Sequence, residues 1–433
     1  MSLFRRLAAA CVVAASLLPS IAPASAAVAY ERVAYFAQWG IYQRNFLVKN
    51  VDTSGAAAKL TTINYAFGNV SEQGLCFEAN EAGVGDAWAD YQKRFKAGES
   101  VDGVGDVVTQ PLAGNFNQLR KLKAKHPGLK ALISLGGWTW SKYFSNAALT
   151  PASRQAFAAS CIDLYLKGNL PKIGTSPHGG PGSGADVFDG IDIDWEWPGS
   201  EGNVGNVVRP EDKQNFTLLL AELRRQLDEY GAQTGRHYYL TAFLPADPAK
   251  IDAGVEVSGV FSSLDFATVQ GYDFNGPWNN RTGHQSNLYS DPNDPSAEKF
   301  SVDAAVGAYL SRGAPAGKIV VGVPAYGKGW KGVPNTNNGL YQTSTGPARG
   351  TYENGTEDYK KIVAARGTRY RDTAIGALWL YDGSNWWSYD DPTLLAQKAQ
   401  YIKARGLGGS MMWSLDGDNA QASLTTALWN ELK

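Results

Sequence analysis

Eight short apolar segments of β-type composition recur along the chain, each long enough for one strand. They are residues 32–39, 61–68, 130–136, 190–197, 238–244, 266–272, 319–325 and 409–414. Runs of this length that are rich in β-branched and aromatic residues are typical of buried strands. The hydrophobic pattern therefore predicts eight strands.

Helical patterns separate several of these segments. Apolar residues recur at intervals of three and four from Phe216 to Leu227, with Gly231 after them, which predicts an amphipathic helix. Further helices are predicted at about residues 116–125, 151–170 and 304–310. Strands that alternate with helices favour a closed parallel (β/α)8 TIM barrel with an outer ring of helices. An open doubly wound sheet is the main alternative, and the strand count disfavours it.

Two long segments interrupt this rhythm. Residues 70–114, after the second strand, are polar and rich in glycine, and residues 326–387, after the seventh, contain aromatic β-type runs of their own. Structureless loops of such length are uncommon in compact domains. We therefore predict one barrel domain over residues 27–433, with an α+β module inserted at residues 327–380.

The first residues resemble an export signal rather than part of the fold. Arg5 and Arg6 precede a short apolar stretch that Pro19 interrupts, and the small residues Ala24-Ser25-Ala26 follow. This pattern predicts a secretory signal peptide over residues 1–26 rather than a membrane anchor. We expect a secreted, extracellular protein.

Composition and charge narrow the choice of partners. The formal net charge of −1 gives no reason to expect nucleic acid or a membrane surface as partner. The 13 Trp and 21 Tyr residues suit a carbohydrate ligand, because sugar faces stack on amphipathic aromatic rings. Beyond the predicted signal peptide, Cys76 and Cys161 could form one disulfide in an exported protein. The place of Cys161 on a predicted helix face favours two separate buried thiols instead.

The segment 190–197, GIDIDWEW, concentrates acidic residues in the fourth predicted strand. Its period of two places four apolar residues on one face and three acids on the other; these are Ile191, Ile193, Trp195 and Trp197, and Asp192, Asp194 and Glu196. A barrel strand has no solvent-exposed face, so the acids should line the interior, with Glu196 nearest the mouth. Stacked carboxylates cannot all ionise freely. At least one should carry a proton near neutral pH and could act as a general acid.

These residues belong to a set of motifs that resembles glycoside hydrolase family 18, the chitinases. DGIDIDWE at 189–196 resembles the acidic signature of the family. SLGGW at 134–138, QGYD at 270–273 and MMWS at 411–414 resemble its other motifs, in the same order. VPAYG at 323–327, followed by the long segment, resembles a bacterial subgroup with an α+β insertion. The resemblance covers essentially the whole chain beyond the signal peptide.

The resemblance implies a retaining mechanism in which the substrate supplies its own nucleophile, the 2-acetamido oxygen. Glu196 would protonate the leaving oxygen and later deprotonate the attacking water. Asp194 would orient the acetamido N–H, Asp192 would share a proton with Asp194, and Tyr272 would hold the acetamido oxygen. Negative charge on the strand would then stabilise a cationic transition state. No cofactor is implied, and no His/carboxylate cluster predicts a metal site.

Further residues are expected to bind the sugar chain: Tyr35, Phe67, Trp138, Gln270, Asp273, Trp278, Tyr326 and Trp413. Trp413 would form the apolar floor beneath the cleaved sugar. Trp138, Trp278 and also Trp39 would stack along the cleft. Many family members have Met at the position of Gln270. The amide of Gln270 adds a polar group there, and the sequence does not specify its role.

Three interpretations of the function remain at this point. The first is a monomeric secreted chitinase that acts on chitin and chitooligosaccharides. The second is an endo-β-N-acetylglucosaminidase that acts on N-glycans, because the same catalytic groups serve both reactions. The third is a chitin-binding lectin on an inactive barrel, against which Glu196, Asp194 and Tyr272 argue.

Overall fold

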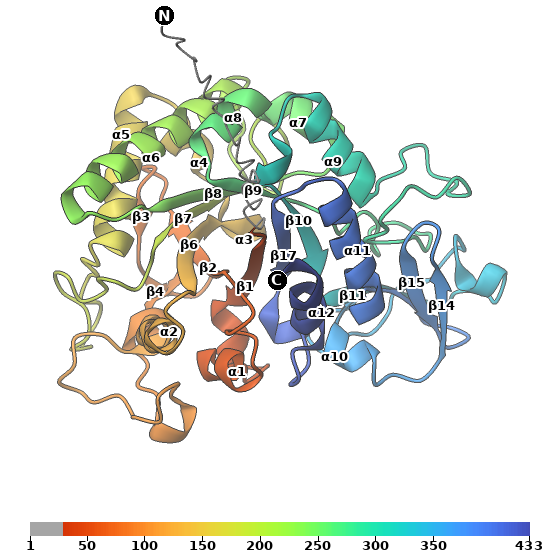
Figure 1. Cartoon of the computed structure of the whole chain (residues 1–433), viewed down its shortest axis with the longest axis horizontal. Helices are drawn as coiled ribbons and strands as arrows, with labels where there is room; N and C mark the ends of the chain where they lie inside the picture. The colour runs from red at the N-terminus through yellow and green to blue at the C-terminus, as the bar shows by residue number, and fades with distance from the viewer. Residues whose placement is uncertain (1–28) are drawn as a thin grey trace, which may run out of the picture.

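The computed structural model describes residues 29–433, and the predicted signal peptide at residues 1–26 lies outside the described residues. Eight parallel strands close into a barrel in the order β1-β17-β10-β9-β8-β7-β6-β2, and β2 pairs with β1 to close it (Figure 1). Their bounds are Glu31–Ala37 for β1, Thr62–Val70 for β2, Lys130–Gly136 for β6, Gly190–Asp194 for β7, Tyr239–Leu244 for β8, Phe266–Val269 for β9, Ile319–Pro324 for β10 and Gly409–Trp413 for β17. The predicted (β/α)8 barrel and all eight strands are confirmed.

Helices surround the barrel and cover the outer face of its strands (Figure 1). The helices of the barrel domain are α1 (Val48–Thr53), α2 (Gly114–Lys125), α3 (Gly137–Trp140), α4 (Phe144–Ala148), α5 (Pro151–Cys161), α6 (Asp212–Thr234), α7 (Pro248–Gly254), α8 (Val257–Ser263), α9 (Val302–Ser311), α11 (Pro392–Ala404) and α12 (Ser423–Leu432). Helix α3 follows β6 at the mouth rather than on the outer face. The sequence specifies several of their ends. Thr150 caps α5 by accepting a hydrogen bond from the Ser153 amide at 3.0 Å, and α6 ends at Gly235 in the left-handed conformation.

A second sheet stands beside the barrel, to the right in Figure 1. Its strands run β12-β11-β16-β15-β14, with β13 on β11, and all its pairings are antiparallel. The bounds are Tyr326–Lys331 for β11, Gly346–Pro347 for β12, Thr356–Asp358 for β13, Thr368–Asp372 for β14, Ala377–Tyr381 for β15 and Trp386–Ser388 for β16, with helix α10 at Tyr359–Ile362. The sheet therefore extends past the predicted limit of residue 380, because β15 pairs with β16. We call residues 326–388 the insertion module.

The long segment after β2 contains short elements of its own. These are β3 (Cys76–Phe77), which pairs with β2 in antiparallel fashion, and β4 (Asn80–Glu81), which pairs with β5 (Gly85–Asp86). Phe95 and Tyr91 from the same segment are buried in the core beside α2. The segment therefore packs on the barrel.

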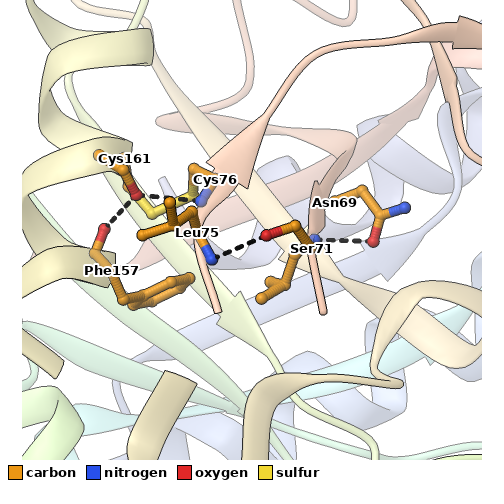
Figure 2. Close-up of a disulfide and its surroundings, with 8 residues drawn as sticks. Asn69, Ser71, Leu75, Cys76, Phe157 and Cys161 are labelled. Atoms are coloured by element: carbon orange, nitrogen blue, oxygen red, sulfur yellow. Dashed lines mark hydrogen bonds between the residues drawn. A yellow bond between two sulfur atoms is a disulfide. The ribbon is translucent and has the colours of Figure 1, made fainter. Parts of the chain in front are cut away.

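Cys76 and Cys161 form a disulfide, so the favoured interpretation of two separate thiols is wrong. The sulfur atoms lie 2.02 Å apart and the Cα atoms 5.0 Å apart. Figure 2 shows β3 lying against α5, where the Cys76 amide donates to Ser160 Oγ at 3.0 Å. The sequence could not reveal this because the pairing of β3 with β2, which carries Cys76 to α5, is not visible in the hydrophobic pattern.

No helix in the range 29–433 combines the length and the apolar character needed to cross a membrane.

Candidate active site

Strand β7 presents two carboxylates to the barrel interior. Ile191 and Ile193 belong to the large core between strands and helices, so Asp192 and Asp194 point the other way, and both are buried. The strand ends at Asp194, and Glu196 follows at the mouth of the barrel, partly buried. Asp192 and Asp194 therefore point inward as predicted, and Glu196 lies near enough for its charge to raise the pKa of Asp194.

The strict alternation predicted for residues 190–197 does not extend to its end. Trp195 packs outward between Phe144 and Phe216, as expected. Trp197, however, belongs to the inner cluster and packs on Phe243 at 5.6 Å between ring centroids. The prediction that all four apolar residues share one face is wrong at Trp197, because the chain leaves the extended conformation after Asp194.

Asp192 lies deepest and is held by three hydroxyl groups from three other strands. Its Oδ2 accepts from the Tyr35 hydroxyl at 2.7 Å and from Ser134 at 2.8 Å, and its Oδ1 accepts from Thr241 at 2.6 Å. Burial raises the pKa of Asp192, and these hydrogen bonds oppose the rise. Ser134 therefore acts as a supporting donor to Asp192.

Asp194 has a different environment from Asp192. Its Oδ1 is buried and has no hydrogen-bond partner among residues 29–433. Burial, followed by the charges of Glu196 and Asp192, raises its pKa well above the usual range. A buried acceptor without a donor is unfavourable, so this oxygen is suited to receive a hydrogen bond from a ligand.

Two side chains fix the backbone of Glu196. Its amide donates to Ser141 Oγ at 2.9 Å, and its carbonyl accepts from Asn206 at 2.9 Å. Burial, and then the charge of Asp273, raises the pKa of the Glu196 carboxyl to about 8, while the Lys250 ammonium opposes this rise. Glu196 therefore carries a proton at neutral pH. The sequence analysis did not identify Ser141, Asn206 or Lys250, because their contacts depend on loop geometry.

Two glycines at the end of β6 allow the chain to pass close to β7. Gly136 has a φ of 108°, and a Cβ there would lie 2.4 Å from the Asp194 carbonyl oxygen. Gly137 has a φ of 70°, and a Cβ there would lie 2.5 Å from the Phe67 ring. Only glycine fits both positions, which accounts for the paired glycines in the motif at 134–138.

A group of aromatic rings lines one side of the mouth. Trp413 stacks on Phe67 with a centroid distance of 5.5 Å and an interplanar angle of 15°, and it lies 5.0 Å from Tyr35. Trp39 lies 6.1 Å from Phe67 and is 40% exposed. The structure thus brings together three predicted sugar-binding residues and Trp39.

Tyr272 stands on the opposite side, just beyond β9. Its ring stacks on Phe243 at 6.1 Å and meets Tyr326 edge-on at 6.1 Å. Burial, followed by the charge of Asp194, raises the pKa of the Tyr272 hydroxyl well above 10, so the group stays a donor. Phe243 was not identified from the sequence, although its place near the end of a predicted strand was a usable indication.

Asp273 connects the insertion module to the mouth. The Tyr326 hydroxyl donates to its Oδ1 at 2.7 Å, and the Lys328 ammonium lies 3.6 Å from the same atom. Lys328 also stands 5.4 Å from the ring of Trp278, which is 61% exposed. Tyr326, Asp273 and Trp278 are therefore connected through Lys328 in one group.

The remaining predicted residues lie apart from these groups. Trp138 is 50% exposed on α3. Gln270 is partly buried, and its Oε1 accepts from the Ala246 amide at 3.4 Å, which connects it to the loop after β8. Asp189 lies outside the barrel interior, where it accepts from the Ala131 amide and pairs with Lys123 and Arg236, so its role is structural.

Within the described range of 29–433, no group of three or more His, Cys, Asp or Glu side chains is arranged to hold a metal ion. The charged groups of the mouth are carboxyl groups and ammonium groups.

A (β/α)8 barrel with buried carboxylates at the C-terminal end of a strand and aromatic rings around its mouth has the architecture of a glycoside hydrolase. The chain matches the family model "Glycosyl hydrolases family 18" over residues 31–418. It belongs to this family.

Known relatives agree with this classification. The chain is 38% identical to Chitinase A1 of Niallia circulans, covering 95% of this chain and 59% of that protein. It is 42% identical to Chitinase C of Streptomyces lividans, covering 90% and 57%. The chain thus spans less than two thirds of the length of these relatives.

Solved structures show the same fold. The catalytic domain of psychrophilic chitinase B from Arthrobacter TAD20 superposes with a TM-score of 0.90 at 50% identity, over 93% of this chain and 95% of that one. A family 18 N-acetylglucosaminidase from Paenibacillus barengoltzii superposes with a TM-score of 0.71 at 32% identity, over 93% and 100%.

Proposed function

We propose that the protein is a chitinase that hydrolyses β-1,4 links between N-acetylglucosamine units in chitin and its oligosaccharides, with retention of configuration. The observation that carries this proposal is that the three carboxyl groups differ in their hydrogen bonds and in their pKa values. Asp192 accepts three hydrogen bonds, Asp194 has a buried oxygen without a partner in the described part of the chain, and Glu196 is protonated at neutral pH.

These different environments argue against a carboxylate as the nucleophile. The two oxygens of Asp192 accept three hydrogen bonds deep in the barrel, so most of its lone pairs are engaged. Burial, and then the charges of Glu196 and Asp192, raise the pKa of Asp194, so this group holds a proton more readily than a free carboxylate and is the weaker nucleophile for it. The substrate's own 2-acetamido oxygen is the remaining candidate.

In the first step, the acetamido oxygen attacks the anomeric carbon while Glu196 donates its proton to the leaving oxygen, and the glycosidic bond breaks. Asp194 Oδ1 accepts the acetamido N–H and balances the positive charge of the cyclic intermediate. The Tyr272 hydroxyl donates a hydrogen bond to the acetamido oxygen and so positions it. In the second step, Glu196 takes a proton from water, and the water oxygen attacks the anomeric carbon and opens the ring.

The aromatic rings support a polymeric substrate. Trp413 and Phe67 offer an apolar floor beside the carboxylates. Exposed rings extend outward from the mouth, including Trp138 and Trp278. Binding energy from remote sugars can be used to distort the reacting sugar. An enzyme that removes only terminal single sugars has less use for such an extended surface.

The test uses partly deacetylated chitosan and chitin oligomers. Hydrolysis should require N-acetylglucosamine on the nonreducing side of the cleaved bond, so new reducing ends should be acetylated, and NMR should detect the β-anomer first. Glucosamine at the new reducing ends, or an α-anomer first, would overturn the substrate-assisted mechanism. Release of single sugars alone from a hexamer would favour an N-acetylglucosaminidase.

We further propose that the protein is exported and acts as a monomer, with residues 27–433 as its catalytic domain. The predicted signal peptide at residues 1–26 supports export, and so does the disulfide, because disulfides persist in oxidising compartments. Analysis of the culture medium and gel filtration would test these two points.

A further inference from the structure

A cavity of about 750 Å³ lies on the side of the molecule between two segments far apart in the sequence. One wall comes from the segment after β2, including Trp88 and Phe95, and the other comes from residues 173–178, before β7. None of the catalytic carboxyl groups lines it. The cavity is therefore separate from the candidate active site.

Three cations line this cavity. They belong to Lys93, Arg94 and Lys96, and none makes an ion pair with a carboxylate between residues 29 and 433; the nearby Asp102 and Asp106 pair with Lys121. The Lys93 ammonium stands 5.0 Å from the centroids of both the Trp88 and the Phe95 rings. The positive charge of this wall is thus not neutralised by neighbouring acids.

One carboxylate, Asp106, also lines the cavity, but the protein already engages it. Its oxygens accept from the Phe95 amide at 2.9 Å, from Gln110 at 3.0 Å and from Asn117 at 2.7 Å. These three donors and Lys121 at 3.8 Å hold it in place. A negatively charged ligand would meet an excess of positive charge.

The residues that line the cavity include a buried histidine, His178, with one nitrogen available. His178 is 2% exposed, and its Nδ1 lies 2.8 Å from the Gln110 carbonyl oxygen. A carbonyl can only accept, so Nδ1 must carry the hydrogen, and in the neutral ring Nε2 is then an acceptor. Nε2 has no partner in the described part of the chain and belongs to a residue that lines the cavity, so it can accept from a ligand hydroxyl.

We propose that this cavity binds an acidic sugar, a saccharide that carries a phosphate or carboxylate group. The oxyanion would lie against Arg94 and Lys96. The apolar face of the ring would pack on Trp88, and a hydroxyl would donate to His178 Nε2. Chitin itself is uncharged when fully acetylated, so this site goes beyond the proposed reaction.

Calorimetry with the whole protein tests the proposal. The probes are N-acetylglucosamine 6-phosphate for the phosphate, N-acetylmuramic acid for the carboxylate, N-acetylglucosamine as the neutral match and inorganic phosphate as the anion alone. At least one acidic sugar should bind about tenfold or more tightly than both N-acetylglucosamine and inorganic phosphate, and less tightly as salt increases. If neither acidic sugar binds more tightly than N-acetylglucosamine, or if inorganic phosphate binds as tightly as the acidic sugars, the proposal is overturned.

Variants assign the binding to this cavity. The double variant Arg94→Glu/Lys96→Glu should weaken acidic-sugar binding about tenfold or more, because two attractive charges become repulsive. Lys361→Glu/Arg366→Glu makes the same charge change at two exposed residues that do not line the cavity, and it should leave binding unchanged. If both double variants lose the same affinity for the acidic sugar, the loss comes from the changed net charge of the protein, and the proposed site is wrong.

A second variant probes the sugar rather than the anion. His178→Phe should weaken binding of the acidic sugar while that of inorganic phosphate stays unchanged. Equal weakening of both ligands, or of neither, would contradict the role assigned to Nε2. Arg94 and Lys96 make no contact with the catalytic carboxyl groups, so the charge variant should hydrolyse chitin oligomers at the wild-type rate. Failure of this proposal is therefore distinguishable from failure of the proposed function.

Discussion

The Tyr35 hydroxyl on β1 donates a hydrogen bond to Asp192 Oδ2 on β7 at 2.7 Å, across the interior of the barrel. Tyr35 also contacts Trp413, whose ring lies 5.0 Å away. One side chain therefore connects the deepest carboxylate to the aromatic floor of the mouth. The charge state of Asp192 depends on this contact, since the hydrogen bond favours the ionised form.

Tyr35→Phe should lower kcat about tenfold or more with little change in KM. Loss of one of three donors raises the pKa of Asp192 further, so its negative charge beside Asp194 is weakened. Tyr65→Phe is the matched control, because Tyr65 is equally buried and also donates to an aspartate, Asp90, but outside the barrel interior. Steady-state kinetics on a chitin oligomer would measure both variants. An equal fall in kcat for the two variants would mean that Tyr35 contributes only to packing.

Glu196→Gln should retain oligosaccharide binding but lose turnover by about 10²–10⁴-fold, because general acid catalysis is removed while the shape of the site is kept. Glu201→Gln, an exposed glutamate five residues further along the chain, is the control and should remain active. Binding by calorimetry and hydrolysis by product analysis separate the two effects. More than a tenth of the wild-type kcat in Glu196→Gln would exclude Glu196 as the acid.

The pH dependence of kcat/KM should reveal the raised pKa of Glu196. Activity requires the protonated acid, so it should be lost as pH rises through about 8. Asp273→Asn removes a negative charge that raises this pKa, so the alkaline limb should move to lower pH. Lys250→Met removes the opposing positive charge, and the limb should move to higher pH. Shifts in the same direction for both variants would contradict this assignment.

Arg44 connects the insertion module to the rim of the barrel through two ion pairs. Its guanidinium lies 3.0 Å from Asp358 of β13 and 3.0 Å from Asp416 after β17, two carboxylates whose side chains are almost fully buried. Arg44→Ala removes one charged donor from each carboxylate, while Lys360 still pairs with Asp358 and Ser414 still donates to Asp416. The variant should lower the free energy of unfolding by about 1.5–3 kcal/mol. Arg405→Ala, which breaks a half-exposed pair with Asp303, should cost at most about 1 kcal/mol in urea unfolding.

The same variant tests whether the insertion module contributes to binding. If the module forms a wall of the cleft, loosening it in Arg44→Ala should raise KM for a chitin hexamer more than for a short activated substrate. Equal changes for both substrates would mean that the module only supports folding.

His284 makes the stability of the insertion module depend on pH. It is buried among the rings of Tyr341, Trp379 and Trp386, and neither ring nitrogen has a partner in the described structure. Burial lowers its pKa from 6.5 to about 4, so between these values the unfolded chain binds more protons. The free energy of unfolding should therefore fall as pH falls from about 6.5 to 4, by about 3 kcal/mol in total.

Urea unfolding at pH 7 and pH 4.5 would measure this dependence. His284→Phe should remove a large part of the difference between the two pH values. His237→Gln changes a half-exposed histidine beside Asp265 and should leave most of it. If the wild type and His284→Phe lose the same stability on acidification, His284 is not its source.

The positions of the strands could be predicted from sequence because they depend on local composition. Every barrel strand, from β1 to β17, coincides with a predicted segment. The inward direction of Asp192 and Asp194 also followed from the two-residue period. The period failed at Trp197, since the strand ends at Asp194 and nothing in the alternation marks that end.

Contacts between distant segments could not be predicted. Ser141 holds the Glu196 amide across 55 positions of the chain, and Arg44 reaches Asp358 over 314. Such contacts depend on how loops of irregular conformation meet above the barrel, for which hydrophobic periodicity carries no information. The resemblance to family 18 identified residues within motifs, whereas these supporting residues lie outside them.

The disulfide encloses α2, β6 and α3 in a covalent ring, because its cysteines stand 85 positions apart. The ring includes the exposed loop around Val104 and Val107. A protease that cuts this loop would leave two fragments joined through Cys76 and Cys161. The nicked protein would migrate as one species on a gel without reductant and as two with it, and a cut there need not release either fragment from the fold.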